Sequence, residues 1–218
     1  SGLKPKELVE AARILARCLD LGSISYSISG GAANSLFLQS TGAVPRVTED
    51  IDLVVQPADG ITAEFVAKWL YTKFPEQFGF KLVYGCEIPV LHLTRKDKPT
   101  KDVEIEIFDV EMWPQRPQYD LSNSNNEVIT LHFSGQRVNV FSGHWQLREK
   151  IVTAYERQHQ QKHETDVADV ESLLGVLPPS SNIIDLSTYA EAVQFVVDKL
   201  PQHRTALEFL VYCPAVLG

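Results

Sequence analysis

The sequence predicts an α+β fold, in which a mixed sheet with flanking helices is followed by a helical lobe. Short stretches with strand-like alternation dominate roughly the first 140 residues, whereas helical periodicity dominates from about residue 144 onward. With 218 residues, of which 44% are hydrophobic, the chain is long enough to bury a core. We therefore divide it into a core, residues 1–142, and a C-terminal helical lobe, residues 143–218.

In the predicted core, residues 5–20 place apolar side chains at helical spacing, and Pro5 suits the first turn of that helix. Residues 24–29 alternate between apolar side chains and serines, which predicts a half-buried strand. Gly30-Gly31 ends this strand, and a short helix is expected over 32–38. Further strands are expected at 50–55, 80–84, 88–94, 102–109, 128–133 and 136–140, with a helix at 62–74 and a loop at 111–126.

The predicted lobe consists of four helices. They are expected at about 145–158 and 166–175, from near Thr188, and at about 203–212. Glu191 follows Thr188 by three residues, which is the spacing of a capping box. Pro178-Pro179-Ser180-Ser181 is expected to link the second helix to the third.

Charge and cysteine content restrict the class of protein. The 28 acidic residues exceed the 20 Lys and Arg, and the net charge of −8 disfavours broad electrostatic adhesion to nucleic acid or to an anionic membrane. No apolar run approaches the roughly 18 to 20 residues that span a bilayer. Three widely spaced cysteines fit reduced thiols, so we expect a cytoplasmic protein without a membrane association.

Two carboxylates stand one residue apart in the predicted strand 50–55. Asp50 and Asp52 point to the same face of that strand, while the apolar residues between and after them point into the core. Two adjacent carboxylates repel each other unless a cation lies between them, and Mg²⁺ prefers such oxygen ligands. The alternative is a solvated polar strand face.

A second acidic face follows in the predicted strand 102–109, where Asp102, Glu104 and Glu106 alternate with apolar residues. These acids either join the metal site or mark an exposed edge strand. Gly30-Gly31, between a strand and a helix, lets backbone N–H groups approach a phosphate at the helix N-terminus, although any tight turn could use the pair.

In this order, the motifs resemble the nucleotidyltransferase superfamily, and the AbiEii toxin-like branch in particular. The resemblance rests on Ser29-Gly30-Gly31-Ala32-Ala33 and on Arg46-Val47-Thr48-Glu49-Asp50-Ile51-Asp52-Leu53. It implies a nucleotidyltransferase-like sheet and a Mg²⁺ site formed by Asp50, Asp52 and a third acid at Glu106, with Glu104 as the alternative. It also implies that Gly30, Gly31, Arg46 and Thr48 contact the nucleotide.

The predicted lobe carries the second part of the resemblance, in Leu147-Arg148-Glu149-Lys150, Arg157, Lys162, Asp166 and Asp169. By helical spacing, Lys150 and Arg157 share a face and could bind a triphosphate, with Lys150 also acting at the catalytic centre. Asp166 and Asp169 are expected in the first turn of the following helix, where they offset its dipole or orient Lys150 or Lys162 toward the nucleotide.

The sequence departs from the usual motifs of this superfamily at three points. A glutamate replaces the third aspartate, Ala32 follows the glycines where a serine is usual, and Thr165-Asp166 replaces an Arg-Asp pair. We expect a Mg²⁺-dependent enzyme that transfers a nucleoside monophosphate from a nucleoside triphosphate to an acceptor. The acceptor (tRNA, protein or small molecule) and a protein partner are left open. The alternatives are an inactive nucleotide-binding module and an enzyme that uses the pocket for another reaction.

Overall fold

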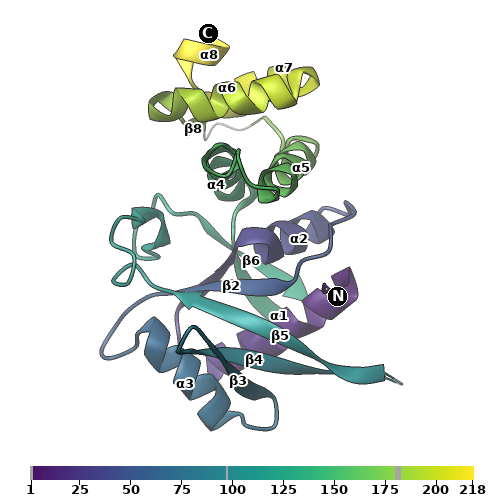
Figure 1. Cartoon of the computed structure of the whole chain (residues 1–218), viewed down its shortest axis with the longest axis vertical. Coiled ribbons are helices and arrows are strands. Elements are labelled where there is room, and N and C mark those ends of the chain that lie inside the picture. The colour runs from purple at the N-terminus through teal and green to yellow at the C-terminus, as the bar shows by residue number, and fades with distance from the viewer. Residues whose placement is uncertain (1, 97, 180–182) are drawn as a thin grey trace. The chain divides into compact units, whose positions relative to one another are not determined.

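The computed structural model describes residues 2–96, 98–179 and 183–218 (Figure 1). The chain divides into two compact units, Ser1–Ser142 and Gly143–Gly218, which are described separately below. Ser180 and Ser181 of the expected linker lie outside the described residues. None of the helices within those ranges combines the length and the apolar content needed to cross a bilayer.

The first unit is built on a seven-stranded mixed sheet with the order β3-β4-β5-β2-β1-β7-β6. Its elements are α1 (Pro5–Leu21), β1 (Tyr26–Ser29), α2 (Gly30–Ser40), β2 (Asp50–Val55), α3 (Ala63–Lys73), β3 (Phe78–Val83), β4 (Cys86–Arg95), β5 (Lys98–Phe108), a 3₁₀ turn η1 (Pro117–Tyr119), β6 (Val128–Phe133) and β7 (Gln136–Phe141). β2 runs antiparallel to β1 and parallel to β5, and β1 runs parallel to β7. The predicted fold class is confirmed.

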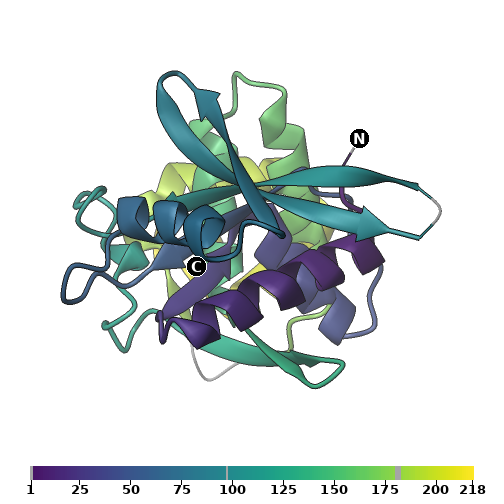
Figure 2. The ribbon, with the colours of Figure 1, turned by 90° about the horizontal axis from the view of Figure 1, so that it is seen from below.

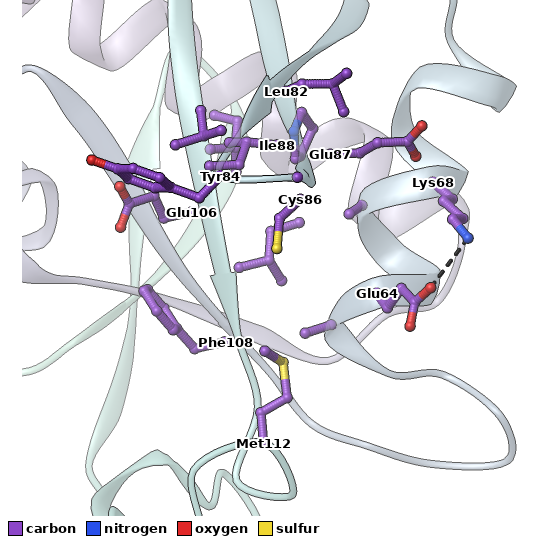
Figure 3. Close-up of a pocket in the computed structure, with 17 residues that line it drawn as sticks. Glu64, Lys68, Leu82, Tyr84, Cys86, Glu87, Ile88, Glu106, Phe108 and Met112 are labelled. Atoms are coloured by element: carbon purple, nitrogen blue, oxygen red, sulfur yellow. Dashed lines mark hydrogen bonds and ion pairs between the residues drawn. The ribbon is translucent and has the colours of Figure 1, made fainter.

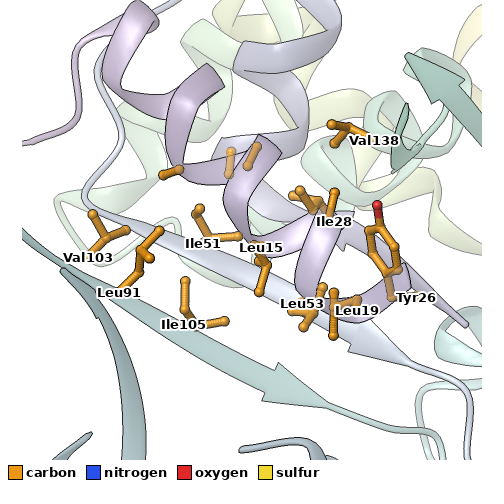
Figure 4. Close-up of a cluster of buried hydrophobic side chains, with 14 of the residues drawn as sticks. Leu15, Leu19, Tyr26, Ile28, Ile51, Leu53, Leu91, Val103, Ile105 and Val138 are labelled. Atoms are coloured by element: carbon orange, nitrogen blue, oxygen red, sulfur yellow. The ribbon is translucent and has the colours of Figure 1, made fainter. Parts of the chain in front are cut away.

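The core of this unit lies between the sheet and the helices α1, α2 and α3. Figure 2 looks onto α1 and α3, and Figure 4 shows Leu15 and Leu19 of α1 beside the core-facing residues of β2 and β5. Ile51, Leu53 and Ile105 are fully buried there, and each such side chain stabilises the fold by about 1.5–3 kcal/mol. Because side chains alternate along a strand, the acids between them face the opposite side of the sheet.

Two expectations about strands need correction. β1 begins at Tyr26 and all four of its residues are buried, so Ser27 and Ser29 are buried rather than solvent-facing. β5 is an interior strand between β4 and β2, which excludes the interpretation of its acids as an exposed edge.

The second unit is mainly helical. It contains α4 (Gly143–Glu156), α5 (Lys162–Leu174), β8 (Ile184–Asp185), η2 (Ser187–Tyr189), α6 (Ala190–Lys199), η3 (Pro201–His203), α7 (Arg204–Leu210), β9 (Val211–Tyr212) and α8 (Pro214–Leu217). The predicted capping box is wrong, because α6 is preceded by a 3₁₀ turn and the Glu191 carboxylate accepts a hydrogen bond from the Tyr155 hydroxyl. The expected last helix ends at Leu210, where β9 begins and pairs with β8.

Candidate nucleotide-binding site

The Gly30 turn brings a helix N-terminus against the first acidic strand. Gly30 has φ +63°, a conformation that side chains with a Cβ rarely adopt, and it follows β1 directly. A Cβ on Gly30 would lie 2.0 Å from Oδ2 of Asp52. Only glycine therefore allows the Asp52 carboxylate to lie against the first turn of α2.

The acids of β2 and β5 lie on one face in matching register. The two strands are parallel, and they pair Asp50 with Glu104 and Asp52 with Glu106. Paired residues on adjacent strands lie about 4.8 Å apart, whereas Asp50 and Asp52 are separated by about 6.6 Å along their strand. The four side chains are half-buried, so neither full solvation nor full burial accounts for them.

The partners of the two glutamates differ. The Lys81 ammonium on β3 forms an ion pair with Glu104, directed away from β2. Glu106 lies opposite Asp52, the aspartate that contacts the Gly30 turn. This arrangement favours Glu106 over Glu104 as the third acid of a site centred on Asp52.

The carboxylates supply the hard oxygen donors that Mg²⁺ requires. Across residues 2–96, 98–179 and 183–218, no three His, Cys, Asp or Glu side chains are already gathered as metal ligands. The register nevertheless places the three acids on one face, with Asp52 about 4.8 Å from Glu106 across the strands and about 6.6 Å from Asp50 along its own strand, and with Asp50 and Glu106 on the diagonal, about 8 Å apart.

Two further residues of the first unit, Arg46 and Thr48, lie beside the N-terminus of α2. A Cβ on Gly31 would lie 2.7 Å from an Nη of Arg46 and 3.1 Å from Oγ1 of Thr48. The Ser35 hydroxyl of α2 donates to the Arg46 carbonyl, which holds this segment across the helix. A guanidinium beside a helix N-terminus is suited to binding an anion such as phosphate.

Four of the lobe residues form an ion cluster, in which three members are buried and Arg157 is partly exposed. Nζ of Lys150 lies 2.8 Å from Asp166 and 2.9 Å from Asp169, and Arg157 contacts Asp166 at 3.2 Å. Lys150, Asp166 and Asp169 are buried, so the cluster is not a solvated helix face. Two cations balance two anions, as a buried cluster requires.

The cluster corrects one expectation about α5. This helix begins at Lys162, so Asp166 and Asp169 lie beyond its first turn and cannot act mainly on the helix dipole. Both instead face Lys150 of α4. Lys162 is exposed at the start of α5, and the ion pairs of the cluster join Lys150 and Arg157 to the two aspartates.

Sequence reasoning missed Asp109, the residue that follows β5. Its buried carboxylate accepts hydrogen bonds from the backbone N–H groups of Ala63, at 2.7 Å, and Met112, at 2.6 Å. It therefore fixes the start of α3 and the loop after β5 to the strand that carries Glu106. The sequence gives one signal for Asp109, which is an acid at the end of a predicted strand. The two N–H groups that Asp109 binds are not predictable from spacing.

Sequence reasoning also missed a cavity of about 890 Å³ beside Glu106 (Figure 3). It lies among α3, the end of β5 and the tip of the β3–β4 hairpin. The pairing of β4 with β5 stops at Val90 and Glu104, next to Pro89, which has no backbone N–H to donate. The hairpin tip thus leaves the sheet and opens the cavity.

The sheet order, the Gly30 turn and the facing acids define a nucleotidyltransferase fold. A family model described as "Nucleotidyl transferase AbiEii toxin, Type IV TA system" matches residues 13–208. The chain belongs to this family, and the resemblance noted in the sequence is confirmed.

One solved structure agrees with this assignment. A nucleotidyltransferase-like antigenic protein from Paracoccidioides brasiliensis is 36% identical, with 99% of each chain covered and a TM-score of 0.88. The antibiotic-resistance factor ANT(2'')-Ia is 15% identical, with 92% of this chain and 93% of the other covered and a TM-score of 0.44. A search of curated proteins found no match.

Proposed function

We propose that the protein is a Mg²⁺-dependent nucleotidyltransferase that transfers a nucleoside monophosphate from a nucleoside triphosphate to an acceptor. One observation carries this proposal: Asp52 lies against the Gly30 turn and faces Glu106 across the parallel pair β2–β5. An anion subsite at a helix N-terminus thereby adjoins a carboxylate pair. Phosphoryl transfer depends mostly on such positioning and charge neutralisation.

Each group of residues has a defined role in the proposed reaction. Asp50, Asp52 and Glu106 would hold Mg²⁺, which would neutralise phosphate charge. The backbone N–H groups after Gly30 and Gly31, with the Arg46 guanidinium, bind phosphate oxygens. Thr48, buried beside Gly31, keeps this segment against α2.

The lobe cluster is proposed to bind a triphosphate, as the spacing of Lys150 and Arg157 in the sequence predicts. Lys150 directs two of its three ammonium protons at aspartates, so one remains for a phosphate oxygen, and Arg157 has further guanidinium donors. Asp166 and Asp169 fix the direction of the Lys150 side chain. Lys162, exposed at the start of α5, is a further candidate for binding the triphosphate.

The proposed reaction is a direct transfer to the acceptor, without a covalent enzyme intermediate. An acceptor hydroxyl oxygen forms a bond to the α-phosphorus, and the bond from that phosphorus to the bridging oxygen breaks. Pyrophosphate leaves with the bonding electron pair, and the hydroxyl proton is released to water. A cytoplasmic location and a protein partner stay predictions from the sequence.

Calorimetric titration of ATP, GTP, CTP and UTP, with and without Mg²⁺, tests the proposal. We expect Mg²⁺-dependent binding that Asp52→Asn abolishes. Asp102→Asn is the matched control, since Asp102 shares the face of β5 but pairs with His92 at 2.7 Å. Nucleotide binding that does not depend on Mg²⁺, or an equal loss of binding in both variants, would contradict the proposed site.

A transfer assay then separates the enzyme from its alternative. We expect label from an α-³²P nucleotide to become attached to an acceptor in a cell extract, and Asp52→Asn to prevent this. Nucleotide binding without any transfer would support the inactive nucleotide-binding module instead.

A further inference from the structure

The cavity beside Glu106 is lined mainly by apolar and aromatic groups. Its walls include Leu82, Tyr84 and Ile88 from the β3–β4 hairpin, Phe108 at the end of β5 and Met112 in the turn that follows (Figure 3). Its volume of about 890 Å³ falls in the range of roughly 300–1,000 Å³ that is typical of small-molecule sites. All of these residues belong to the first unit.

The charges in the cavity are predominantly negative. The residues that line it include Glu64, Glu87 and Glu106, and Lys68 is the only base among the described lining residues. The Glu87 carboxylate accepts a hydrogen bond from the Tyr71 hydroxyl of α3. The Lys68 ammonium already pairs with Glu64 at 3.1 Å. A triphosphate is therefore disfavoured here, whereas an organic cation is favoured.

The strand order separates this cavity from the anion subsite. Register places Ser29, Asp52 and Glu106 in one row across β1, β2 and β5, with about 4.8 Å between neighbours. The Gly30 turn stands at the β1 end of this row, and the cavity adjoins the β5 end. A ligand in the cavity would meet the carboxylates from the side opposite the phosphates.

The backbone conformation at position 84 does not favour a tyrosine. It begins the two-residue turn between Val83 and Cys86 with φ +50°, a conformation that favours Asn or Asp before Gly. Its side chain is fully exposed at the mouth of the cavity, so core packing does not account for it either. A bulky residue held in this conformation is explained if its ring contacts a ligand.

We propose that this cavity is the acceptor site and that it takes a small organic cation with a flat apolar body. The inference rests on the proposed function and names the substrate class of that site. The aromatic and apolar walls contact the body of the acceptor, Tyr84 covers it at the mouth, and the carboxylates attract its cationic group. The acceptor hydroxyl then lies on the Glu106 side of the carboxylates.

Cys86 provides a direct reporter of occupancy. It lines the cavity and is exposed, whereas Cys18 and Cys213 are buried, and burial raises the pKa of the Cys18 thiol to about 11. Iodoacetamide will therefore label Cys86 selectively. The rate of labelling, followed by mass spectrometry, measures the fraction of cavities that are empty.

Two probes with the same ring and opposite charge test the proposal. Tryptamine carries an ammonium on an indole ring, and indole-3-propionate carries a carboxylate on the same ring. We expect tryptamine at ten times its Kd to slow Cys86 labelling roughly tenfold, because only empty cavities react, and indole-3-propionate to leave the rate unchanged. Equal protection by both probes, or by neither, would overturn the proposal.

A matched pair of turn variants tests the role of Tyr84. Ser134, with φ +48°, begins the two-residue turn of the β6–β7 hairpin, outside the cavity lining. Tyr84→Asn and Ser134→Asn should both raise the melting temperature, since each relieves the same backbone strain. Only Tyr84→Asn should weaken tryptamine protection. Unchanged protection in Tyr84→Asn would remove the proposed contact.

Measurements of nucleotide binding on the same samples distinguish the proposed acceptor site from the proposed transferase function. Mg²⁺-nucleotide should bind together with tryptamine, and displacement of tryptamine by nucleotide would show that the cavity belongs to the nucleotide. Nucleotide binding without tryptamine protection would refute the acceptor site alone. Tryptamine protection without nucleotide binding would refute the proposed transferase function instead.

Discussion

Replacing Gly30 with alanine tests the contact on which the site is built. Alanine at φ +63° costs about 1–2 kcal/mol from the backbone conformation alone. The new Cβ would also lie 2.0 Å from Oδ2 of Asp52, so the carboxylate must move, and such overpacking costs about a further 1–3 kcal/mol. We expect a total loss of about 2–5 kcal/mol in the free energy of unfolding, measured by urea denaturation.

Gly135 is the matched control for this variant. It has φ +84°, and a Cβ there would meet nothing within 4 Å. Gly135→Ala should therefore show only the backbone cost of about 1–2 kcal/mol. An equal loss in Gly30→Ala and Gly135→Ala would refute the contact with Asp52.

A double-mutant cycle isolates the carboxylate. In an Asp52→Ala background, the nearest Asp52 atom left to the new Cβ of Gly30→Ala is Cβ, at 3.4 Å, an ordinary contact. The coupling between the two substitutions should then be about 1–3 kcal/mol, and Gly30→Ala should cost no more than Gly135→Ala. Coupling near zero would place the Asp52 carboxylate elsewhere.

Three other predictions concern groups that support the site. Asp109→Ala should cost about 2–4 kcal/mol in urea denaturation, because two backbone N–H groups lose their acceptor, and Asp109→Asn should cost less. Hydrogen bonding from the Lys4 backbone N–H, with Lys101 and Arg95 nearby, lowers the pKa of Glu7 to about 2. Its stabilisation is complete above pH 4.5 and is lost as the pH falls toward 2, so stability should fall less steeply in Glu7→Gln across that window. Asp169→Ala leaves Lys150 with one buried partner and should cost about 3–5 kcal/mol, whereas an unchanged melting curve would contradict the buried cluster.

The acidic strands were predictable because their signal is local. Alternation of carboxylates with apolar residues fixes both the strand and its faces, and β2 spans Asp50–Val55, as expected. The Gly30 turn was predictable for the same reason, since glycine stands where a strand meets a helix. Which residues face each other across β2 and β5 depends on register, and alternation alone left Glu104 and Glu106 equivalent.

The parts that were missed depend on contacts between distant residues. The cavity exists because β4 and β5 separate after Val90 and Glu104, and no local pattern in either strand shows where their pairing ends. Lys150 and Asp166 are 16 residues apart, and their burial follows from how α4 packs on α5. A charged helix face in a sequence indicates solvent by default, and only helix packing reverses that interpretation.

The sheet topology orders the proposed subsites, and no single motif does. β2 and β5 are parallel, so Asp52 and Glu106 point to one face at the same height, whereas β1 is antiparallel to β2 and delivers Gly30 to that same row. The row begins at the helix N-terminus, passes through the carboxylates and ends at the cavity. A phosphate, a metal ion and an apolar ligand would therefore each bind beside a different strand. A nucleotide and an acceptor that enter from opposite ends of this row would be brought together at the carboxylates.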